Sequence, residues 1–349
     1  MAFLSHELLA MIFEEHADDL STLHSCMLVN RNWCVVALQY LWAKPFTLLL
    51  SSGRRTIDGP SKNLMITFIR CFTDTDINSL MEARLCKRYS KRFPFDYSLY
   101  LKEIRFKEIE ILTRQCTGYN SFHLYYMRVG ITRLAMKYCP NLNTLSLRTE
   151  NSAYIDQSRF LLSINNLSRV QNLSWYLDLD DNIFSALSRA ARNLKSISVK
   201  CRRSCYFKLG SRNHGLQKLV RSQRQLKTFT LKHVTVSMRS VFELLESQSN
   251  SLESLVLSDI DIDPDDSNIE PIRFHHLTRI YIKNCRILKT GLNPIFEADL
   301  PELQQLKFEN NYWKHKSDWI PLQDLCLIQN KIVYSGNSSD IIQNLKVHL

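Results

Sequence analysis

The sequence is poor in glycine and proline, with 8 glycines and 9 prolines among 349 residues. This composition excludes collagen-like repeats and glycine-rich linkers. Neither G-x-G-x-x-G nor G-x-x-x-x-G-K-[ST] occurs, so the glycine-rich loops with which many enzymes hold phosphate groups are missing. No apolar run approaches the ~18 residues that a membrane-spanning helix needs, and we expect no membrane partner.

The sequence also lacks recognisable motifs for catalysis and zinc binding. The ten cysteines are scattered and form no C-x-x-C pair, and Cys201, Cys205 and His214 have poor spacing for a zinc site. No histidine shares a nucleophile motif with a serine or cysteine, and G-x-S-x-G is absent. Residues 1–16 contain no basic segment of the kind that opens a secretory signal peptide. We therefore expect an intracellular protein, cytoplasmic or nuclear or both, with no catalytic activity, no metal and no cofactor.

One acidic segment imitates a calcium-binding loop. Asp259, Asp261, Asp263 and Glu270 reproduce the 1-3-5-12 spacing of an EF-hand loop. Position six of such a loop is glycine because the chain turns sharply there, but Pro264 occupies it. We interpret the segment as an acidic loop between repeats.

Most of the chain repeats a motif with apolar residues at relative positions 1, 4 and 6. Its copies begin at Leu101, Leu142, Val170, Leu194, Leu226, Leu252, Leu277, Leu303 and Leu322. From Leu142 onward, successive copies lie 19 to 32 residues apart. An ordinary α/β core with leucine-rich strands also produces single copies, but nine copies at nearly regular spacing indicate stacked units with one strand each.

This pattern resembles the leucine-rich repeat, L-x-x-L-x-L-x-x-N/C-x-L. Position 9 carries the expected residue in Cys285, Asn311 and Asn330 but not in the other copies, so we do not expect a continuous asparagine ladder. Helical spacing appears between the strands, in segments 182–192, 216–220 and 237–248. We expect an α/β fold in which residues 99–349 form a curved solenoid, with parallel strands on the concave side and helices on the convex side.

Residues 1–48 predict three short helices. We expect them to begin close to Ser5, Asp19 and Asn30, which are helix-capping residue types, and the third to end at Pro45. The apolar residues of the first helix, which are Leu4, Leu8, Leu9, Ile12 and Phe13, surround more of it than a three-helix core can cover. Because so small a segment usually needs a partner, we expect another protein to cover part of this surface. Residues 49–98 are expected to form a helical linker that caps the first repeat.

The same amino-terminal residues resemble an F-box, whose pattern runs L-P-x-E-L-L…I-F, then Asp-Leu, then L-V-N-R-x-W, then A…L-W. The matching residues are Leu4, Glu7, Leu8, Leu9, Ile12, Phe13, Asp19, Leu20, Leu28, Val29, Asn30, Arg31, Trp33, Ala37, Leu41 and Trp42. Ser5 departs from the pattern, because the family usually has proline there. An unrelated helical cap for the repeats is the alternative interpretation.

The resemblance to fungal F-box proteins with leucine-rich repeats implies the substrate receptor of an SCF-type ubiquitin ligase. In that family the F-box binds a Skp-type adaptor, which links it to cullin and RING subunits, and the repeats hold a protein substrate. The residues that the resemblance assigns to adaptor binding are Leu4, Glu7, Leu8, Ile12, Phe13, Leu28, Val29, Arg31 and Trp33. A repeat scaffold with a vestigial F-box and a nucleic-acid binder are the alternative functions.

Position 7 of the repeat motif concentrates positive charge. Because side chains alternate along a strand, we expect positions 4 and 6 in the core and positions 3, 5 and 7 on the concave surface. Five of the nine position-7 residues are basic, in a chain with 45 Lys and Arg, 34 Asp and Glu and a net charge of +11. The candidate substrate-binding residues are Lys107, Arg148, Tyr176, Lys200, Lys232, Tyr281 and Lys283. They predict an acidic or phosphorylated substrate segment, although lysines that only keep an exposed sheet soluble would give the same excess. Aromatic residues are too few on this surface to favour nucleic acid.

Overall fold

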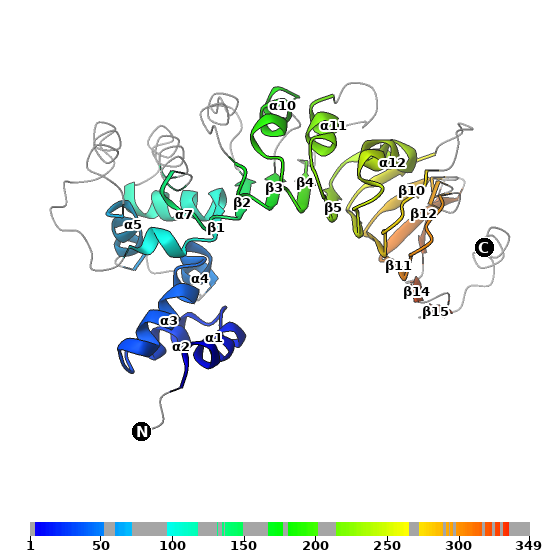
Figure 1. Cartoon of the computed structure of the whole chain (residues 1–349). Coiled ribbons are helices and arrows are strands. Elements are labelled where there is room, and N and C mark those ends of the chain that lie inside the picture. Colours follow the sequence, from blue (N-terminus) through cyan, green and yellow to red (C-terminus); the bar gives the residue numbers. More distant parts are fainter. Residues whose placement is uncertain are drawn as a thin grey trace. The chain divides into compact units, whose positions relative to one another are not determined.

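The computed structural model (Figure 1) describes residues 4–51, 60–71, 96–117, 131, 135, 137–148, 167–176, 181–201, 214–264, 272–288, 291–292, 294–295, 298–315, 318–322, 325–328 and 331–334. The fold is α/β, with parallel strands in sheets and several helices, as the sequence predicts at this level. The chain divides into two compact units, Met1–Val170 and Gln171–Leu349.

The first unit opens with the three predicted helices, α1 (His6–Glu15), α2 (Leu20–Met27) and α3 (Arg31–Leu41). Each begins at a predicted capping residue. The Ser5, Asp19 and Asn30 side chains accept hydrogen bonds from backbone N–H groups in the first turns of their helices. These bonds satisfy N–H groups that have no partner inside the helix, and so they fix where each helix begins.

Pro45 does not end α3, contrary to the prediction. The helix already ends at Leu41, where the Trp42 N–H donates to the Leu38 carbonyl, and Pro45 is the first residue of α4 (Pro45–Ser51). Pro60 likewise begins α5 (Pro60–Ile69). Proline suits the first position of a helix because its missing N–H would have no intrahelical partner there. Residues 52–59 and 72–95, which belong to the predicted helical linker, lie outside the described residues.

Aromatic pairs join these helices to the following chain. Phe46 of α4 packs edge-on against Phe68 of α5, with ring centroids 5.1 Å apart. Trp42 stacks on Tyr97 of the short helix η1 (Tyr97–Tyr100), at 4.3 Å between centroids. The polypeptide after α3 is thus anchored by packed rings.

The first repeat copy differs from its prediction. Strand β1 is only Glu103–Arg105, and the chain continues directly into α7 (Phe106–Thr117). Lys107, expected at position 7 of a strand, is therefore a helical residue. Ile109 and Leu112 are fully buried at helical spacing, which favours a helix at this point. Strand β2 (Thr144–Arg148) pairs with β1 in parallel, with Ile104 opposite Leu145.

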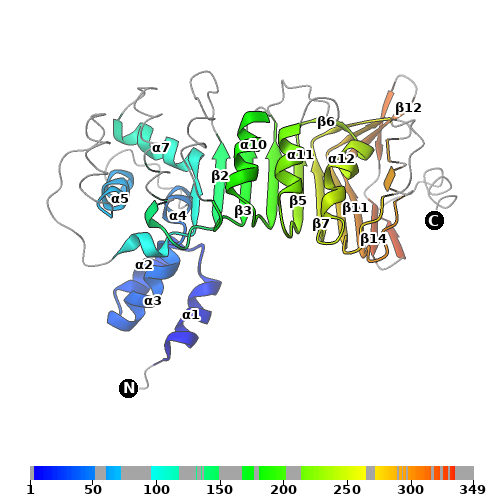
Figure 2. The ribbon, with the colours of Figure 1, turned by 45° about the horizontal axis from the view of Figure 1, so that its top comes forward.

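Within the described residues, the second unit contains six parallel strands in one sheet, drawn side by side in Figure 2. In sheet order they are β3 (Asn172–Tyr176), β4 (Ser196–Lys200), β5 (Thr228–Lys232), β7 (Ser254–Ser258), β9 (Arg279–Lys283) and β11 (Gln305–Glu309). Every neighbouring pair is in the same register, so motif positions align from strand to strand. Positions 4 and 6 are at most 3% exposed in all six strands, as predicted.

Three helices of the described residues lie against the apolar face of this sheet (Figure 2). They are α10 (Asp181–Ala190), α11 (His214–Arg221) and α12 (Met238–Leu245), followed by the short helix η3 (Glu246–Gln248). Trp175 of β3 contacts Phe184 of α10, with centroids 5.1 Å apart. The core therefore lies between helices and sheet, and motif positions 3, 5 and 7 face the other way.

A left-handed residue follows each of the last four parallel strands. His233, Asp259, Asn284 and Asn310 have φ values of 54°, 56°, 52° and 51°. His, Asp and Asn are the side-chain-bearing residues that adopt this conformation most readily. The turn leads each time into a second strand, and these are β6 (Thr235–Ser237), β8 (Asp261–Asp263), β10 (Arg286–Leu288) and β12 (Asn311–His315). These strands form their own parallel sheet.

The last repeat copy, beginning at Leu322, does not continue the parallel pattern. Leu322 ends β13 (Asp318–Leu322), which pairs with β12 in the antiparallel direction. Leu325 and Leu327 belong to β14 (Leu325–Ile328), which runs antiparallel to β11 and pairs with β15 (Lys331–Tyr334). Strand pairing therefore changes from parallel to antiparallel in both sheets, at β13 in one and at β14 in the other.

No single helix of the described residues is long and apolar enough to cross a membrane. Only α3 and α4 taken together reach that length and composition, and the pair is bent by 85°.

Candidate functional site

The three amino-terminal helices share a small closed core. Leu9, Phe13, Leu23 and Ala37 are 0% exposed, and Val36 is 3% exposed. The Phe13 ring packs edge-on against Trp33 and Tyr40, with centroids 5.5 and 6.4 Å away. The Tyr40 hydroxyl donates to the Ala10 carbonyl at 2.8 Å and so joins α3 to α1. Phe13, assigned to adaptor binding by the sequence, is thus a core residue, and Trp33 is half-buried beside it.

A set of large apolar side chains lies outside this core. Leu4, Leu8, Met11 and Ile12 are 41%, 50%, 66% and 43% exposed, and Leu28 and Val29 are 75% and 58% exposed. We call these six residues the apolar stripe. Leu8, Met11 and Ile12 are spaced i, i+3 and i+4 in α1, which places them along one side of the helix, and Leu4 lies just before its N-cap Ser5. Met11 was not among the predicted contacts, although this spacing would have included it.

Asn32 brings the two parts of the apolar stripe together. Its side-chain amide donates to the Leu4 carbonyl at 3.4 Å, and its amide oxygen pairs with the His6 ring. Because Asn32 is in the first turn of α3, the turn that carries Leu28 and Val29 lies beside the start of α1. The predicted contacts Glu7 and Arg31 are exposed polar residues at this same end. Hydrogen bonds from its own backbone N–H and from Ser5 lower the pKa of Glu7, which keeps its carboxylate charged.

A second candidate surface is the sheet face turned away from the helices. In the second unit, position 7 forms a column of in-register residues, which are Tyr176, Lys200, Lys232, Ser258, Lys283 and Glu309. Arg148 is the last residue of β2 and belongs, like Lys107 of α7, to the first unit. Strand neighbours lie about 4.8 Å apart, so side chains in this column are adjacent.

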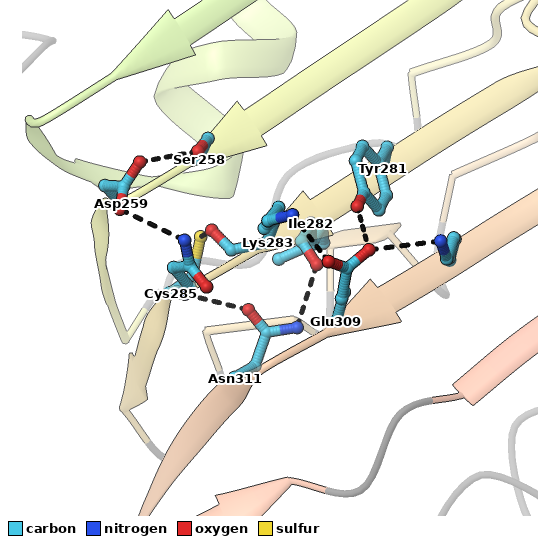
Figure 3. A network of polar contacts seen from close by, with 10 residues as sticks. Ser258, Asp259, Tyr281, Ile282, Lys283, Cys285, Glu309 and Asn311 are labelled. Atoms are coloured by element: carbon cyan, nitrogen blue, oxygen red, sulfur yellow. Dashed lines mark hydrogen bonds and ion pairs between the residues drawn. The ribbon is translucent and has the colours of Figure 1, made fainter. Parts of the chain in front are cut away.

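Glu309 binds the basic residues at one end of the column through its carboxylate (Figure 3). Its carboxylate accepts hydrogen bonds from Lys283 at 2.5 Å, from Lys307 at 3.1 Å and from the Tyr281 hydroxyl. These contacts, led by Lys283, lower the pKa of Glu309 to about 2. The Lys307 ammonium also lies 5.0 Å from the centre of the Tyr281 ring. Tyr281 and Lys283, both predicted substrate contacts, are therefore engaged with an acid of the chain itself.

The other end of the column has a different arrangement. The Lys200 ammonium lies 4.8 Å from the centre of the Tyr176 ring. Such a contact orients the lysine side chain without neutralising its charge. Among the ion pairs of the described residues, none involves Lys200 or Lys232. The two halves of this column therefore differ in how far their charge is compensated.

Buried polar side chains hold successive rows together. Asn311 is 1% exposed, and its side chain accepts from the Cys285 N–H and donates to the Ile282 carbonyl, both at 2.8 Å (Figure 3). Cys285, the position-9 residue one row earlier, donates its thiol to the Lys283 carbonyl at 3.1 Å. Burial raises the pKa of Cys285 to about 12, so its thiol stays protonated and unreactive. Asn330 lies outside the described residues.

Two buried glutamines, missed by the sequence analysis, perform a similar role. Gln248 accepts from the Leu226 N–H at 3.1 Å and donates to the carbonyls of Val220 and Gln223 at 3.0 and 3.1 Å. Gln223 accepts from the Leu194 N–H at 3.0 Å and donates to the carbonyls of Ala191 and Leu219 at 2.8 and 2.7 Å. Both side chains provide hydrogen-bond partners for backbone groups that are buried in the core and cannot bond to water.

The acidic residues of the calcium-like segment are occupied by protein groups. Asp259 accepts hydrogen bonds from Ser258 at 2.6 Å and Asn284 at 3.3 Å. Asp261 forms a two-point ion pair with Arg286, at 2.6 and 2.5 Å. Glu270 and Cys205 lie outside the described residues. In the described part of the chain, no group of three or more His, Cys, Asp or Glu is arranged to hold a metal ion.

Comparison with known proteins gives no assignment. No protein-family model matches the chain, and no curated protein matches it significantly.

Proposed function

We propose that the chain is the substrate-recognition subunit of an SCF-type ubiquitin ligase. Its first 48 residues act as an F-box that binds a Skp-type adaptor, and through it cullin and RING subunits. The repeats form a curved leucine-rich-repeat solenoid that holds a protein substrate. The chain contributes recognition and no chemistry of its own. The observation that carries the proposal is the apolar stripe beside a closed core.

The apolar stripe supports a protein partner on energetic grounds. The core of the three helices is already complete, because Leu9, Phe13 and Leu23 exclude water fully. The stripe residues add nothing to that core and keep large apolar surfaces in water. Contiguous exposed apolar surface of this kind marks contact sites, since its burial in an interface is favourable. Glu7 and Arg31 supply a polar rim, as is typical of protein interfaces.

The repeat architecture supports the other half of the proposal. Each row of the second unit places positions 4 and 6 inside and positions 3, 5 and 7 outside, in register with its neighbours. Stacked rows of this type give an extended surface whose side chains vary without disturbing the core. Such a surface is suited to binding another protein.

Adaptor binding of Ile12→Lys tests the proposal. Ile12 is 43% exposed, so the substitution leaves the core intact while placing a charge in the apolar stripe. The full chain, co-expressed with a Skp-type adaptor, should bind it in the wild type and lose most binding in the variant. Gln39→Lys, which adds the same charge at an exposed position two turns along α3 from Arg31, should bind normally.

Thermal unfolding of both variants shows whether they are folded. Full adaptor binding by a folded Ile12→Lys variant would overturn the use of the apolar stripe. A wild-type chain that binds no adaptor would leave a repeat scaffold with a vestigial F-box as the better description.

A further inference from the structure

The outward face of strands β3, β4, β5 and β7 has an unusual composition. Its first two rows, at motif positions 3 and 5, consist of Asn172, Ser174, Ser196, Ser198, Thr228, Thr230, Ser254 and Val256. All are small or short side chains, and most carry a hydroxyl group, although Ser254 of β7 is only 8% exposed. We call these eight residues the hydroxyl strip. The third row, at position 7, is Tyr176, Lys200, Lys232 and Ser258.

The register makes these rows continuous across the strands. Ser174 lies opposite Ser198, which lies opposite Thr230, and the position-7 residues align in the same way. With strands about 4.8 Å apart, hydroxyl groups and lysines form parallel lines that run across the sheet. Short side chains allow another polypeptide to approach the sheet closely, and hydroxyls both donate and accept hydrogen bonds.

This face carries no acidic side chain within its own rows, and a carboxylate that interacts with Lys200, that of Asp259, lies directly after β7. The twelve outward positions of the four strands carry two lysines and no Asp or Glu. Lys200 and Lys232 occupy adjacent strands in register. Neighbouring strands lie about 4.8 Å apart, which is below the Debye length of about 8 Å at physiological salt, so the fields of these two lysines add. Tyr176 holds Lys200 from one side and thereby reduces the entropy that the lysine loses when it binds an anion.

Strands β9 and β11 offer a contrasting surface on the same face. Their outward side chains are long, and Lys283, Lys307 and Tyr281 are gathered by Glu309. An anionic ligand would have to displace that carboxylate, and a polypeptide would have to lie above bulky groups. The face of β3 to β7 is therefore better suited to an anionic ligand than the face of β9 and β11, although the latter carries more cations.

We propose that this β3–β7 face binds an extended anionic segment of a partner protein. The segment runs across the strands, with its backbone over the hydroxyl strip and its negative groups at Lys200 and Lys232. Carboxylate and phosphate share the chemistry that the two lysines recognise. The proposal that this face binds an anionic segment is argued from the surface alone. Only the statement that the segment belongs to a ubiquitination substrate rests on the proposed function. Nucleic acid is disfavoured because Tyr176 is the one aromatic residue among the twelve positions.

A degenerate peptide array tests the proposal directly. Nine-residue peptides, each with one fixed residue and random elsewhere, are probed with the labelled full chain. Peptides fixed as Asp, Glu, phosphoserine or phosphothreonine should bind more strongly than those fixed as Ala, Gln or Lys. Comparison of the carboxylate and phosphate sets identifies the preferred source of the anion. A nine-nucleotide deoxythymidine strand, measured in parallel, represents nucleic acid.

Two matched double variants locate the binding. Lys200→Glu with Lys232→Glu should weaken binding of the selected peptides about tenfold or more and flatten its dependence on salt. Lys218→Glu with Arg221→Glu makes the same charge change at exposed positions of α11, on the opposite side of the sheet, and should bind as the wild type does. Lys200→Arg with Lys232→Arg keeps the charge and should retain binding.

The outcomes are decisive in both directions. Array signals without preference for anionic residues, equal losses in the two charge-reversal variants, or tighter binding of the deoxythymidine strand than of any peptide would each overturn the proposal. Adaptor binding, measured on the same preparations, separates this inference from the proposed function. If the chain binds the adaptor but shows no preference for anionic peptides, this inference is wrong and the proposed function stands. If the chain prefers anionic peptides but binds no adaptor, the proposed function is wrong and this inference stands.

Discussion

The three amino-terminal helices and the parallel sheet of the second unit treat apolar side chains in opposite ways. In the helices, Met11 and Leu28 remain 66% and 75% exposed although a closed core lies next to them. In the sheet, the apolar positions 4 and 6 are buried throughout, and the outward positions of β3 to β5 are polar. The same physical forces act on both regions. The exposed apolar side chains of the three helices therefore form a surface feature of their own, which the proposed adaptor would cover.

The two regions also place their polar hydrogen bonds differently. The helices satisfy backbone groups at exposed caps such as Ser5 and Asp19, where water offers an alternative partner. The sheet region satisfies them inside the core through Gln223, Gln248 and Asn311. A polar bond in the core has no substitute when it is broken, so the sheet region should be the less tolerant of polar substitutions.

The largest expected effect sharpens the distinction between core and apolar stripe. Leu9 and Leu8 are neighbours in α1, but the first is 0% and the second 50% exposed. Leu9→Ala should lower the free energy of unfolding by about 2–5 kcal/mol, because it leaves a cavity in a small core. Leu8→Ala should cost less than about 1 kcal/mol, since it removes mainly hydrated surface. Urea unfolding followed by circular dichroism measures both, and equal losses would remove the distinction.

Gln248→Leu tests the claim that buried polar bonds hold the rows of the sheet together. The variant removes the side-chain partner of the Leu226 N–H and of the Gln223 carbonyl in the core, while the Val220 carbonyl keeps its bond from the Gln223 N–H. Each buried group without a partner costs about 1–3 kcal/mol, and relaxation of the core recovers part of this cost. We therefore expect the free energy of unfolding to fall by about 3 kcal/mol. Gln304→Leu, at an exposed position before β11, is the control and should be nearly neutral. A stability of Gln248→Leu close to wild type would show that the apolar core suffices.

Gly215→Ala tests how closely two helices of the second unit approach. A Cβ atom at Gly215 would lie 2.5 Å from the Asp181 carbonyl oxygen and 2.7 Å from the Asp181 Cα, and neither backbone atom moves easily. The Gly215 N–H also donates to the Asp181 carboxylate at 3.0 Å. Separating α11 from α10 should cost about 1–3 kcal/mol, even though alanine favours helices. Lys218→Ala in the same helix should show no comparable loss in the same melting experiment.

The smallest expected effect concerns the exposed charge cluster of the sheet. The pKa of Glu309 lies at about 2 in the folded chain, below its ordinary 4.5, so its ionised form stabilises the fold. This contribution is complete above pH 4.5 and disappears as the pH falls towards 2. Wild type should therefore melt slightly higher than Glu309→Gln at pH 7, and the difference should vanish near pH 2. Exposed Glu246→Gln is the control, and a difference that grows on acidification would reverse the assignment.

Sequence reasoning succeeded where a periodic apolar pattern determines the structure. The apolar residues of positions 4 and 6 predicted the strands and their buried faces, and segments 182–192 and 237–248 predicted α10 and α12 to within a few residues. Exposure of Leu4, Leu8 and Ile12 also followed from the sequence, because the apolar residues of the first helix exceed what three helices can bury, whereas the exposure of Met11 was not predicted. These features depend on local spacing alone.

The sequence failed where one residue fits two local structures. Proline fits either the end of one helix or the start of another, and the side chains that α4 buries, among them Phe46 on Phe68, favour the second at Pro45. Leu101, Ile104 and Phe106 fit the strand motif, yet Phe106 begins a helix with Ile109 and Leu112 in the core. Gln223 and Gln248 lie outside the motif, so nothing marked them as buried. Their role depends on the carbonyl groups of neighbouring rows, which a single sequence does not display.

The reversal of chain direction at β14 limits how the repeat array can grow. On that side β11 is already paired with a strand of opposite direction, with Leu306 facing Leu327. A new parallel row therefore has no place beyond it. A tandem duplication of residues 252–276, by contrast, would insert one strand, one left-handed residue and one second strand between existing rows, all in the original direction. Gene duplication can thus lengthen both sheets from within by whole rows, while the antiparallel end is carried along unchanged.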